Sequence, residues 1–519
     1  MKKNLLTLML LCSSMITYSQ EIARGYVYDD ANNNGKKERS EAGIPKVAVS
    51  NGIDVVLTDA KGCYAVPVSE GNTLFVIKPS GYKTAVDNDY IPQFHYHHKP
   101  KGSPATTTYK GVSPTGKMPT TVDFALYKYN EPEHFSAIVF GDPQPYSLDD
   151  LDYFTRKIVD DVKKTEQTLF GISLGDIVGD NLDLQPVYKE RMRRLQLPWY
   201  NVMGNHDMNY DAPTDELSDE TFERNFGSAN YAFNYGNAHF IIIDNILYPD
   251  PRDGNGYWGG YRLDQLLFLE NNLKHIPKDK LIVLSQHIHM KDEAGYRTGD
   301  RQRLFDLLKD FDNVLIMSAH THLQDQIEYT IDQGWQGKKP LHEFNVGTTS
   351  GDWYSGKMDD AGLPDATMRD GTPQGYLFLN INGNRYDVDY KVAGKSAEYQ
   401  MHIYASKVVR YKGATTPVVV NFFMGSKNDL VEYRIDKGAW QKMRYTEAID
   451  PSYLTKLIEW DFTDKLLPGR RPSNAENSTH LWSGSLKTDL PPGEHTIEVR
   501  ATDRYGKQHV GSSKYTILE

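Results

Sequence analysis

The sequence predicts a fold of the α/β (α+β) class, in which a central layered domain is flanked by two β-sandwich domains. Three observations favour it: strand-like runs between turns over 21–128, alternating strand and helix patterns over 129–394, and a return to strand-like runs over 395–519. The length of 519 residues corresponds to about three or four domains of ordinary size. Hydrophobic residues make up 39% of the chain, enough for such domains to form large buried cores.

The first twenty residues differ from everything that follows. Lys2 and Lys3 precede a mostly apolar run over 5–11, and small and polar residues follow over 13–20. This order is typical of a secretory signal peptide, so we expect residues 1–20 to be removed and the protein to be exported to the periplasm, the cell surface or the medium. The alternatives are an N-terminal helix that stays in the fold and a lipid anchor at Cys12.

The charge and cysteine content exclude some classes of protein. Lys and Arg number 58 and Asp and Glu 69, and the net charge of −11 argues against a nucleic-acid partner held by charge. A small anionic substrate is compatible with this charge, because bound metal ions can reverse the charge of a pocket. After the signal only Cys63 remains, so no intrachain disulfide can form. No later stretch has the roughly 18–20 apolar residues of a membrane span.

The two outer domains are predicted from runs of β-branched and aromatic residues that are separated by turn signals. In the first domain we expect strands over 25–28, 47–49, 55–57, 64–66 and 74–77, with a turn over 59–62. In the last domain we expect strands over 418–423, 430–435 and 495–500, with a turn over 491–493.

The central domain is predicted from the spacing of apolar residues, which alternates along the chain between strand-like and helical patterns. Buried strands are expected over 135–140, 170–174, 199–203, 240–243, 281–284 and 314–317. Helical spacing of apolar residues lies between them, over 148–164, 185–195, 215–226, 261–275 and 300–311. Alternation of the two patterns predicts layered α/β structure.

Polar side chains with metal-binding chemistry follow the ends of five of these strands. They are Asp142, Asp176, Asp180, Asn205, His206, Asp207, His287, His320 and His322. In α/β sheets, ligands bind at the carboxyl ends of strands. Oxygen and imidazole donors together suit divalent transition metals. Two metal ions that share a carboxylate need about eight protein contacts, close to the number available here.

In chain order these residues form five short motifs: Asp142-Pro143-Gln144, Gly175 to Asp180, Gly204-Asn205-His206-Asp207, His287, and Ala319-His320-Thr321-His322. Their order and spacing resemble the calcineurin-like metallophosphoesterases, whose pattern is D-x-H, G-D-x-x-D, G-N-H-[DE], a lone H and G-H-x-H. The resemblance implies a four-layer sandwich for the central domain. The three-domain organisation is also similar to that of a subset of secreted bacterial members with β-domains at both ends.

The resemblance also implies a role for each position. One metal would be held by Asp142, Gln144, Asp176 and His322, and the other by Asp176, Asn205, His287 and His320. His206 would be the catalytic imidazole, oriented by Asp180 or Asp207. The two ions would be divalent, with Mn, Fe, Zn or Mg as candidates. His289 is expected to be no ligand, because the family uses one histidine in this segment.

The expected reaction is hydrolysis of a phosphate mono- or diester. Two metals would activate a bridging hydroxide that attacks phosphorus in line, and His206 would protonate the leaving oxygen. Gln144 stands where the family usually has histidine, and a glutamine oxygen is a harder and weaker donor. A cell-surface binding protein with a degenerate phosphoesterase core is therefore the second hypothesis. The Asp-Pro-Gln form resembles the secreted subset, which argues against simple loss of activity.

Two loops carry further candidate residues for binding a small phosphate-ester substrate. The segment 347–356 reads GTTSGDWYSG and offers Trp353 and Tyr354 at the expected mouth of the pocket. The segment 365–375 carries Arg369, which could hold a phosphate oxygen. An ordinary long loop with aromatic anchors is the alternative.

The first β-domain carries a separate metal-binding pattern. Asp30, Asn32, Asn34 and Glu41 fit the spacing D-x-[DN]-x-[DN]-G-x₅-E, in which oxygen atoms surround Ca²⁺ and Gly35 allows a sharp turn. The flanks are strand or loop, so a helix-loop-helix hand is not expected. The loop resembles the calcium loops of bacterial surface β-domains. A turn rich in Asn and Gly without a metal is the alternative.

Overall fold

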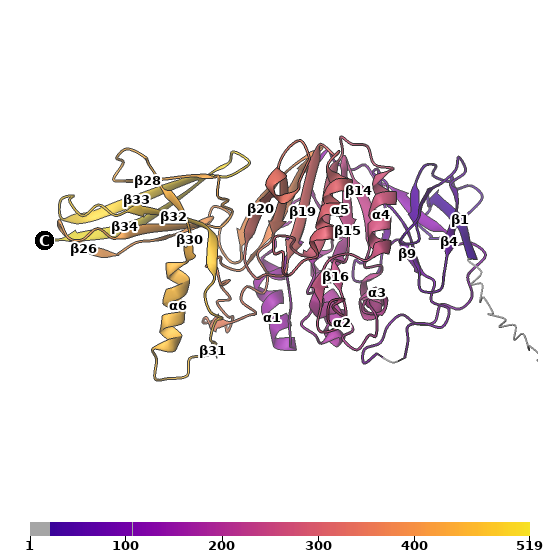
Figure 1. Ribbon diagram of the computed structural model, residues 1–519, viewed down its shortest axis with the longest axis horizontal. Helices are drawn as coiled ribbons and strands as arrows, with labels where there is room; N and C mark the ends of the chain where they lie inside the picture. Colours follow the sequence, from indigo (N-terminus) through magenta and orange to yellow (C-terminus); the bar gives the residue numbers. More distant parts are fainter. Residues whose placement is uncertain (1–20, 106) are drawn as a thin grey trace, which may run out of the picture.

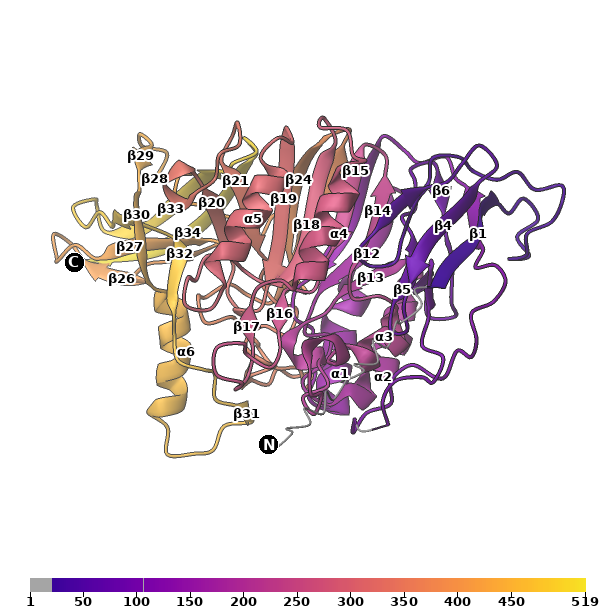
Figure 2. The same ribbon diagram turned by 45° about the vertical axis from the view of Figure 1, so that its right-hand side comes forward.

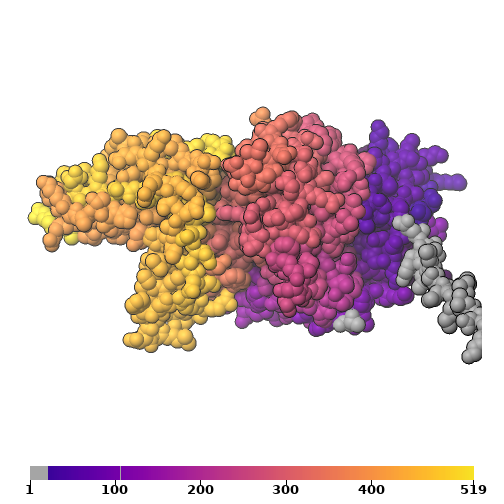
Figure 3. All heavy atoms as spheres, in the orientation of Figure 1, coloured from indigo at the N-terminus to yellow at the C-terminus, as the bar shows by residue number. Residues whose placement is uncertain are grey.

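The computed structural model describes residues 21–519 except residue 106, and these residues form an elongated molecule. Three groups of β-sheets follow one another along its long axis in the order of the sequence (Figure 1). The space-filling view places the three groups side by side, with one arm of the last group projecting from it (Figure 3). The predicted signal peptide lies outside the described residues.

The first group contains two four-stranded sheets and a small two-stranded one. The first sheet is ordered β4 (Cys63–Val68), β1 (Glu21–Asp29), β10 (Phe124–Lys128), β6 (Tyr82–Lys83). The second is ordered β3 (Val55–Leu57), β2 (Ala48–Ser50), β5 (Thr73–Val76), β9 (His95–His97), and β7 (Ala85–Val86) pairs with β8 (Pro92–Gln93). In β4, Tyr64, Val66 and Val68 are buried while Ala65 is exposed. This alternation is expected where one face of a sheet covers a core.

Two mixed sheets form the central part. The five-stranded sheet is ordered β13 (Trp199–Val202), β12 (Thr168–Leu174), β11 (His134–Phe140), β23 (Gly375–Asn382), β24 (Arg385–Val392). The six-stranded sheet is ordered β14 (Tyr231–Tyr235), β15 (Ala238–Ile242), β18 (Leu281–Ile288), β19 (Asn313–Ala319), β21 (Leu341–Asn345), β20 (Asp325–Tyr329). Strands β11, β12 and β13 are parallel, as are β15, β18, β19 and β21. Every residue of β18 is buried, as expected for a strand covered on both faces.

Aromatic side chains fill the space between these two sheets. Tyr200 of β13 stacks on Phe233 of β14 with ring centroids 3.8 Å apart. Phe170 of β12 meets Phe240 of β15 edge to face at 5.2 Å. Such pairs add directional contacts to the burial of large apolar surfaces. The sheets are thereby held in a fixed relation, so that their strand ends meet at one edge.

Five helices accompany the central sheets: α1 (Leu148–Lys157), α2 (Gln185–Met192), α3 (Glu220–Phe226), α4 (Leu263–Leu273) and α5 (Thr298–Leu308). Figure 2 shows α4 and α5 lying across the six-stranded sheet. All five correspond to segments predicted as helical; four have shorter bounds, and α5 begins two residues before the predicted start at 300 and ends before 311. The helix expected over 148–164 ends at Lys157 and continues as a 3₁₀ turn over Val159–Asp161. The segment expected over 215–226 divides into a 3₁₀ turn over Asp215–Leu217 and α3.

The last group again contains two sheets. One is ordered β25 (Met401–Tyr404), β27 (Pro417–Phe422), β32 (Asn477–Ser485), β30 (Arg444–Ile449). The other is ordered β26 (Val408–Arg410), β34 (Gln508–Leu518), β33 (Gly493–Thr502), β28 (Leu430–Ile435), β29 (Gln441–Lys442).

One helix of this last group was not predicted. It is α6 (Pro451–Asp461), in the connection between β30 and β32. Asp450 caps it by accepting hydrogen bonds from the amides of Ser452 and Tyr453, and Pro451 occupies its first turn. The chain after α6 forms β31 (Gly469–Arg470), which pairs with β22 (Gly356–Lys357) of the central part. An arm of the last domain thus reaches the core.

Both outer groups are joined to the core by buried polar contacts. Lys78 pairs with Glu131 at 2.8 Å and also donates to the carbonyl of Asn234. On the opposite side, His480 Nε2 lies 3.2 Å from Asp370 Oδ2, and both residues are buried. Among the described residues, no helix is both long and apolar enough to cross a membrane.

Candidate active site

The predicted metal ligands meet at the carboxyl ends of strands from both central sheets. Asp142 and Gln144 follow β11, Asp176 follows β12 and Asn205 follows β13 in the first sheet. His287 ends β18, and His320 and His322 follow β19 in the second. All seven are buried except His320, which is partly buried. The structure therefore brings together every residue that sequence analysis proposed as a metal ligand.

One cluster of donor atoms is centred on His287. Its Nε2 lies 3.3 Å from Asp176 Oδ1, 3.1 Å from Asn205 Oδ1 and 3.2 Å from His320 Nδ1. The ligand atoms of Asp176, His287 and His320 all lie within 4.8 Å of one another. One carboxylate, one amide oxygen and two imidazoles therefore converge on one point.

A second cluster is centred on His322. Its Nε2 lies 2.7 Å from Gln144 Oε1 and 3.3 Å from Asp142 Oδ2. Gln144 Nε2 donates to the hydroxyl of Tyr146 at 3.2 Å, which turns the amide oxygen toward His322. Asp142 lies between the two clusters, because its Oδ1 is 3.9 Å from His287 Nδ1.

The hydrogen bonds on the far side of the imidazoles test the fit of these donors to a cation. His287 Nδ1 donates to the carbonyl of Leu174 at 2.8 Å, and His322 Nδ1 donates to the carbonyl of Gly351 at 2.7 Å. In the neutral ring of His322, Nε2 then carries a lone pair that faces the amide oxygen of Gln144, so acceptor faces acceptor. Burial opposes the charged form of His287, but Asp176 and Asp142 outweigh it and raise its pKa to about 9, so its Nε2 donates toward Asn205 unless a metal ion displaces the proton. A divalent cation between the imidazole nitrogen and the amide oxygen satisfies both, and the donor set fits one.

Burial and neighbouring charges set the ionisation of the cluster. Burial lowers the pKa of His320 to about 3, with a further contribution from His287, and burial lowers the pKa of His322 to about 4. Both rings are therefore neutral at physiological pH, as metal ligation requires. Burial disfavours the charged form of Asp176, but His287 and His206 outweigh it and hold its pKa well below the usual range. Burial, opposed by His287, raises the pKa of Asp142 to about 7.

The ligands are held by strained turns. Asp142 has a φ of 29°, Gln144 39°, Asp176 47°, His320 77° and His322 55°. Side chains other than glycine rarely adopt this left-handed region, and such residues concentrate at functional sites. These backbone conformations direct each side chain away from its strand and toward the edge where the ends of the two sheets meet.

Two glycines of the motifs have a steric role. A Cβ atom on Gly204 would lie 2.0 Å from the amide nitrogen of Asp176, and one on Gly175 would lie 2.4 Å from His287 Nδ1. Neither position can accept a side chain without moving a ligand. The glycines that precede the aspartate and asparagine ligands are therefore required by packing.

His206 lies beside the ligand cluster and pairs with Asp180. Its Nδ1 is 2.6 Å from Asp180 Oδ1, and its backbone amide donates to Asp176 Oδ1 at 2.9 Å. Asp207, the other orienting residue considered from sequence, is turned away from this ring. Its carboxylate instead accepts hydrogen bonds from the amides of Ile177, Val178 and Gly204. Asp180 is therefore the carboxylate placed to orient this ring, and Asp207 braces the loop after β12.

Of the predicted substrate residues, Trp353 is the one at the cluster. Its ring stacks on His322 with centroids 4.0 Å apart and planes 25° apart. Tyr354 is buried and donates its hydroxyl to the carbonyl of Pro143, so it supports the Asp142–Gln144 turn and is not available to substrate. Arg369 donates to the carbonyl of Thr321 at 2.8 Å, behind the ligand-bearing loop. Tyr354 is therefore placed in a supporting role. The guanidinium of Arg369 also lies over the ring of Trp353, 5.6 Å from its centroid, so its contact with substrate stays a prediction.

Three further residues at the site were not found by sequence reasoning. Tyr146 meets the ring of His206 edge to face at 5.9 Å, and Tyr257 meets His320 in the same way at 6.1 Å. Arg470, in β31 of the last domain, donates to the carbonyl of Trp353. The Asp-Pro-Gln-Pro-Tyr sequence could have indicated Tyr146. No local signal indicates Arg470, since its partner lies 117 residues earlier.

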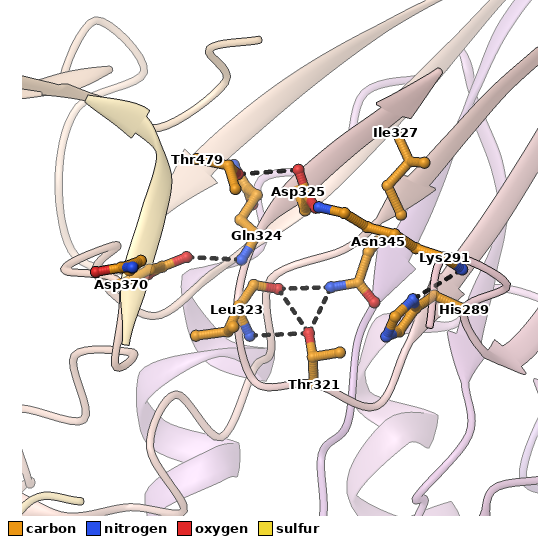
Figure 4. A pocket seen from close by; sticks show the side chains of 11 residues that line it. His289, Lys291, Thr321, Leu323, Gln324, Asp325, Ile327, Asn345, Asp370 and Thr479 are labelled. Atoms are coloured by element: carbon orange, nitrogen blue, oxygen red, sulfur yellow. Dashed lines mark hydrogen bonds and ion pairs between the residues drawn. The ribbon is translucent and has the colours of Figure 1, made fainter. Parts of the chain in front are cut away.

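A small pocket lies against the other side of the ligand-bearing loop, between the core and the last domain (Figure 4). Its volume is about 200 Å³, and its lining includes Thr321, Asp325 and Thr479. Thr479 Oγ1 donates to Asp325 Oδ1 across the domain boundary at 2.9 Å. His289 also lines this pocket, and its Nδ1 accepts from the amide of Lys291 at 3.2 Å. Burial lowers the pKa of His289 to about 4.

Comparison with family models gives matches over most of the chain. The model described as calcineurin-like phosphoesterase matches residues 135–324, which contain every predicted ligand. The models described as the N terminal and the C terminal of calcineurin-like phosphoesterase match residues 31–113 and 343–509. The chain belongs to the calcineurin-like phosphoesterase family. This is a family of metal-dependent phosphoester hydrolases, which implies divalent metal ions and a small phosphate-ester substrate.

A curated relative and two solved structures are also similar to this chain. A probable glycerophosphodiester phosphodiesterase GpdQ of Arcobacter nitrofigilis is 27% identical over 155 residues, which cover 28% of this chain and 52% of the relative. The chain thus spans about half the length of this curated relative. The purple acid phosphatase PPD1 from yellow lupin (Lupinus luteus) seeds matches with a TM-score of 0.36 and 13% identity, over 72% of this chain and 66% of that one. GAP50, the anchor in the inner membrane complex of Plasmodium, matches with a TM-score of 0.32 and 14% identity, over 50% and 85%.

Proposed function

We propose that the protein is an exported phosphoesterase that hydrolyses a phosphate mono- or diester at a centre for two divalent metal ions. The observation that carries the proposal is the pair of donor-atom clusters around His287 and His322, in each of which an imidazole nitrogen lies beside an amide oxygen. One ion would be held by Asp142, Gln144, Asp176 and His322. The other would be held by Asp176, Asn205, His287 and His320. When bound, such ions polarise phosphate oxygens and lower the pKa of a nucleophilic water.

His206 is proposed as the group that transfers a proton to the leaving oxygen. Asp180 accepts from Nδ1 at 2.6 Å, which fixes the ring and leaves Nε2 for the substrate. Burial opposes the charged form of His206, but Asp176 and Asp180 outweigh it and raise its pKa to about 9. The imidazolium at this position can both stabilise the developing negative charge and supply the proton.

Gln144 supports an active centre over a degenerate one. Its oxygen is directed at His322 by the hydrogen bond to Tyr146, and Tyr354 supports its turn from behind. A position under no demand for ligation would not require this orientation or the left-handed backbone at Gln144. The second hypothesis, a surface binding protein with a degenerate core, is therefore disfavoured.

We also propose the finer architecture expected from the sequence: a four-layer sandwich over 129–394 and β-sandwich domains over 21–128 and 395–519. The aromatic contacts between the central sheets and the helices α4 and α5 outside one of them support the four layers. The two sheets of each outer group support the β-sandwiches. Export rests on the sequence pattern of residues 1–20 alone.

Metal content and hydrolysis together test this function. The chain without residues 1–20 would be stripped of metal, reconstituted with Mn²⁺, and assayed with an aryl phosphate monoester and a bis-aryl diester. We expect about two ions per chain and hydrolysis of at least one ester. Failure to retain ions after reconstitution, together with no hydrolysis, would overturn the proposal and favour the binding protein. The ratio of monoester to diester rates would assign the subclass.

A further inference from the structure

The loop between Asp30 and Glu41 is closed at its neck by the backbone. The amide of Asp29, at the end of β1, donates to the carbonyl of Ala42 at 2.9 Å, and Tyr28 forms an antiparallel bridge with Gly43. The first and last residues of the loop are therefore neighbours in space. The carboxylates of Asp30 and Glu41, eleven positions apart in sequence, belong to one small enclosure.

The side-chain oxygens at the start of the loop are turned toward its interior. Asp30 Oδ1 accepts from the amide of Asn34 at 3.1 Å, and Asp30 Oδ2 accepts from the amide of Gly35 at 2.6 Å. Asn32 Oδ1 accepts from the amide of Asn34 at 3.1 Å. Gly35 has a φ of 71°, where a side chain would be strained, and it makes the sharp turn that brings these groups together.

The charge of this enclosure is not balanced by the protein. Asp30 is 2% exposed and Glu41 is 7% exposed. Within the part of the chain that the structure describes, no Lys, Arg or His forms an ion pair with either carboxylate. The nearest lysine, Lys37, donates instead to the backbone carbonyls of Glu38 and Glu41, at 2.7 Å each. Buried carboxylates without a counter-charge are strongly unfavourable, so this pair favours the binding of a cation.

Glu41 carries the most specific sign of a ligand. Its Oε2 accepts from the amide of Glu38 at 2.9 Å, which turns the carboxylate into the loop. Its Oε1 is fully buried and has no hydrogen-bond partner among the described residues. In folded proteins a buried carboxylate oxygen is normally bound by a hydrogen-bond donor or by a metal ion.

We propose that the Asp30–Glu41 loop is a Ca²⁺ site of the first domain, separate from the phosphoesterase centre. The ligands are the carboxylates of Asp30 and Glu41 and the amide oxygens of Asn32 and Asn34, with water completing the shell. Hard oxygen donors at a flexible spacing select Ca²⁺ over the smaller Mg²⁺, which needs near-ideal octahedral geometry. With two carboxylates the affinity belongs in the weak range of extracellular modules, with a Kd of roughly 10⁻⁴–10⁻³ M.

The position of the loop gives the ion a structural task. It joins the end of β1 to the segment that returns along β1, so Ca²⁺ ties together two parts of the chain at the start of the domain. An ion that binds the folded domain alone stabilises it by mass action. The concentration of Ca²⁺ outside cells then supports the fold that precedes the catalytic core.

Terbium luminescence tests the site directly, because Tb³⁺ takes Ca²⁺ positions and is sensitised by nearby tyrosines. Tyr28 adjoins the loop, and the amide of Asp30 donates to the carbonyl of Leu126 at 2.9 Å, so the next residue, Tyr127, also lies near the loop. The full chain should show Tb³⁺ emission that Ca²⁺ displaces. Glu41→Gln and Asp30→Asn should each lose most of this emission. The same removal of charge in Asp59→Asn, an exposed carboxylate of a neighbouring turn, should leave it unchanged.

Two further measurements separate this site from the catalytic one. In an Asp176→Asn background the displaceable emission should persist, and Ca²⁺ should still raise the unfolding temperature. Glu41→Gln should lose the Ca²⁺-dependent shift while keeping Mn²⁺-dependent hydrolysis. If Glu41→Gln does not fold, the double variant Asn32→Ala, Asn34→Ala replaces it. Emission that is absent, that is equal in Glu41→Gln and the parent, or that disappears in Asp176→Asn overturns the calcium site and leaves the phosphoesterase proposal standing.

Discussion

The ligand cluster and the rim around it, which Trp353 and Arg470 form, are built in different ways. In the cluster, each side chain is aimed by its own strand end and by the turn next to it, as in Asp142, which follows β11 with a φ of 29°. In the rim, Trp353 is held by Arg470, which lies 117 residues away on an arm of another domain. The only strand pairing between that arm and the core is the short pair β22 and β31, within the described residues.

This difference separates chemistry from selectivity. The cluster depends on strand-end turns of the core and on contacts among its five motifs, so its failure should abolish hydrolysis of every phosphate ester. The rim depends on how the last domain is docked, so changes there should alter some substrates more than others. The predictions below sharpen or break this division.

Loss of the charge at the centre should have the largest effect. Asp176→Asn keeps the size of the side chain but removes the carboxylate shared by both proposed metal positions, so retention of both ions should fall and kcat should drop by about 10³-fold or more. Metal analysis and steady-state kinetics measure this. Asp183→Asn, an exposed carboxylate in the same segment, is the matched control and should behave as the parent. Normal metal content and rate in Asp176→Asn would contradict the proposed cluster.

Removal of the proposed proton donor should have the second-largest effect on the rate. His206→Ala should lower kcat by about 10²–10⁴-fold for esters with poor leaving groups, and less for acidic phenols, because a good leaving group needs no proton. Asp180→Asn should cause a smaller loss, since Asp180 only orients the ring. Metal content should stay unchanged in both. A loss of rate that is the same for every leaving group would assign His206 to another role.

The support behind Gln144 should have a moderate effect on stability. Tyr354→Phe removes the hydroxyl that donates to the Pro143 carbonyl and leaves a buried acceptor without its partner. We expect a loss of about 1–3 kcal/mol in the free energy of unfolding. Chemical denaturation measures it. The control is Tyr153→Phe, whose ring lies 6.3 Å from that of Tyr354. Equal stability of the two variants would remove Tyr354 from the supporting structure.

The rim should give the smallest but most selective effect. Arg470→Ala releases Trp353 and removes an exposed positive charge at the site, so KM should rise about fivefold, equivalent to about 1 kcal/mol, for a bulky or doubly charged phosphate ester. KM for a small aryl phosphate should change little. Arg471→Ala is the matched control, because Arg471 is paired with Asp461 at 2.6 Å and 2.8 Å. Equal changes for both substrates would show that the rim does not select.

The sequence was sufficient to predict the seven-residue ligand cluster. Each ligand or pair of ligands follows a buried strand, and the carboxyl ends of parallel strands converge at one edge, so local order along the chain carries the spatial arrangement. The division into two strand-rich regions and a central region of alternating strands and helices was also predicted, because the spacing of apolar residues differs between strands and helices. Family comparison confirms the resemblance on which the ligand roles were based.

Other features depended on contacts that no local pattern encodes. Sequence spacing could not decide between Asp180 and Asp207, because the choice rests on which carboxylate faces the ring and which faces three backbone amides. The burial of Tyr354 and the turn of Arg369 toward Thr321 are likewise results of packing. Aromatic and basic residues in a loop are compatible with either a substrate role or a supporting one until their neighbours are known.

What the sequence by itself determined is the set of candidate metal ligands, since the motifs are short and each strand carries its own donors to the common edge. What only the tertiary structure decided is the rim, the braces behind the ligands, and the unbalanced pair of buried carboxylates at Asp30 and Glu41. The physical reason is that charge balance, hydrogen-bond satisfaction and domain docking are properties of neighbours in space. These properties depend on contacts between segments that are distant in sequence, and neither the composition nor the spacing of apolar residues indicates those contacts.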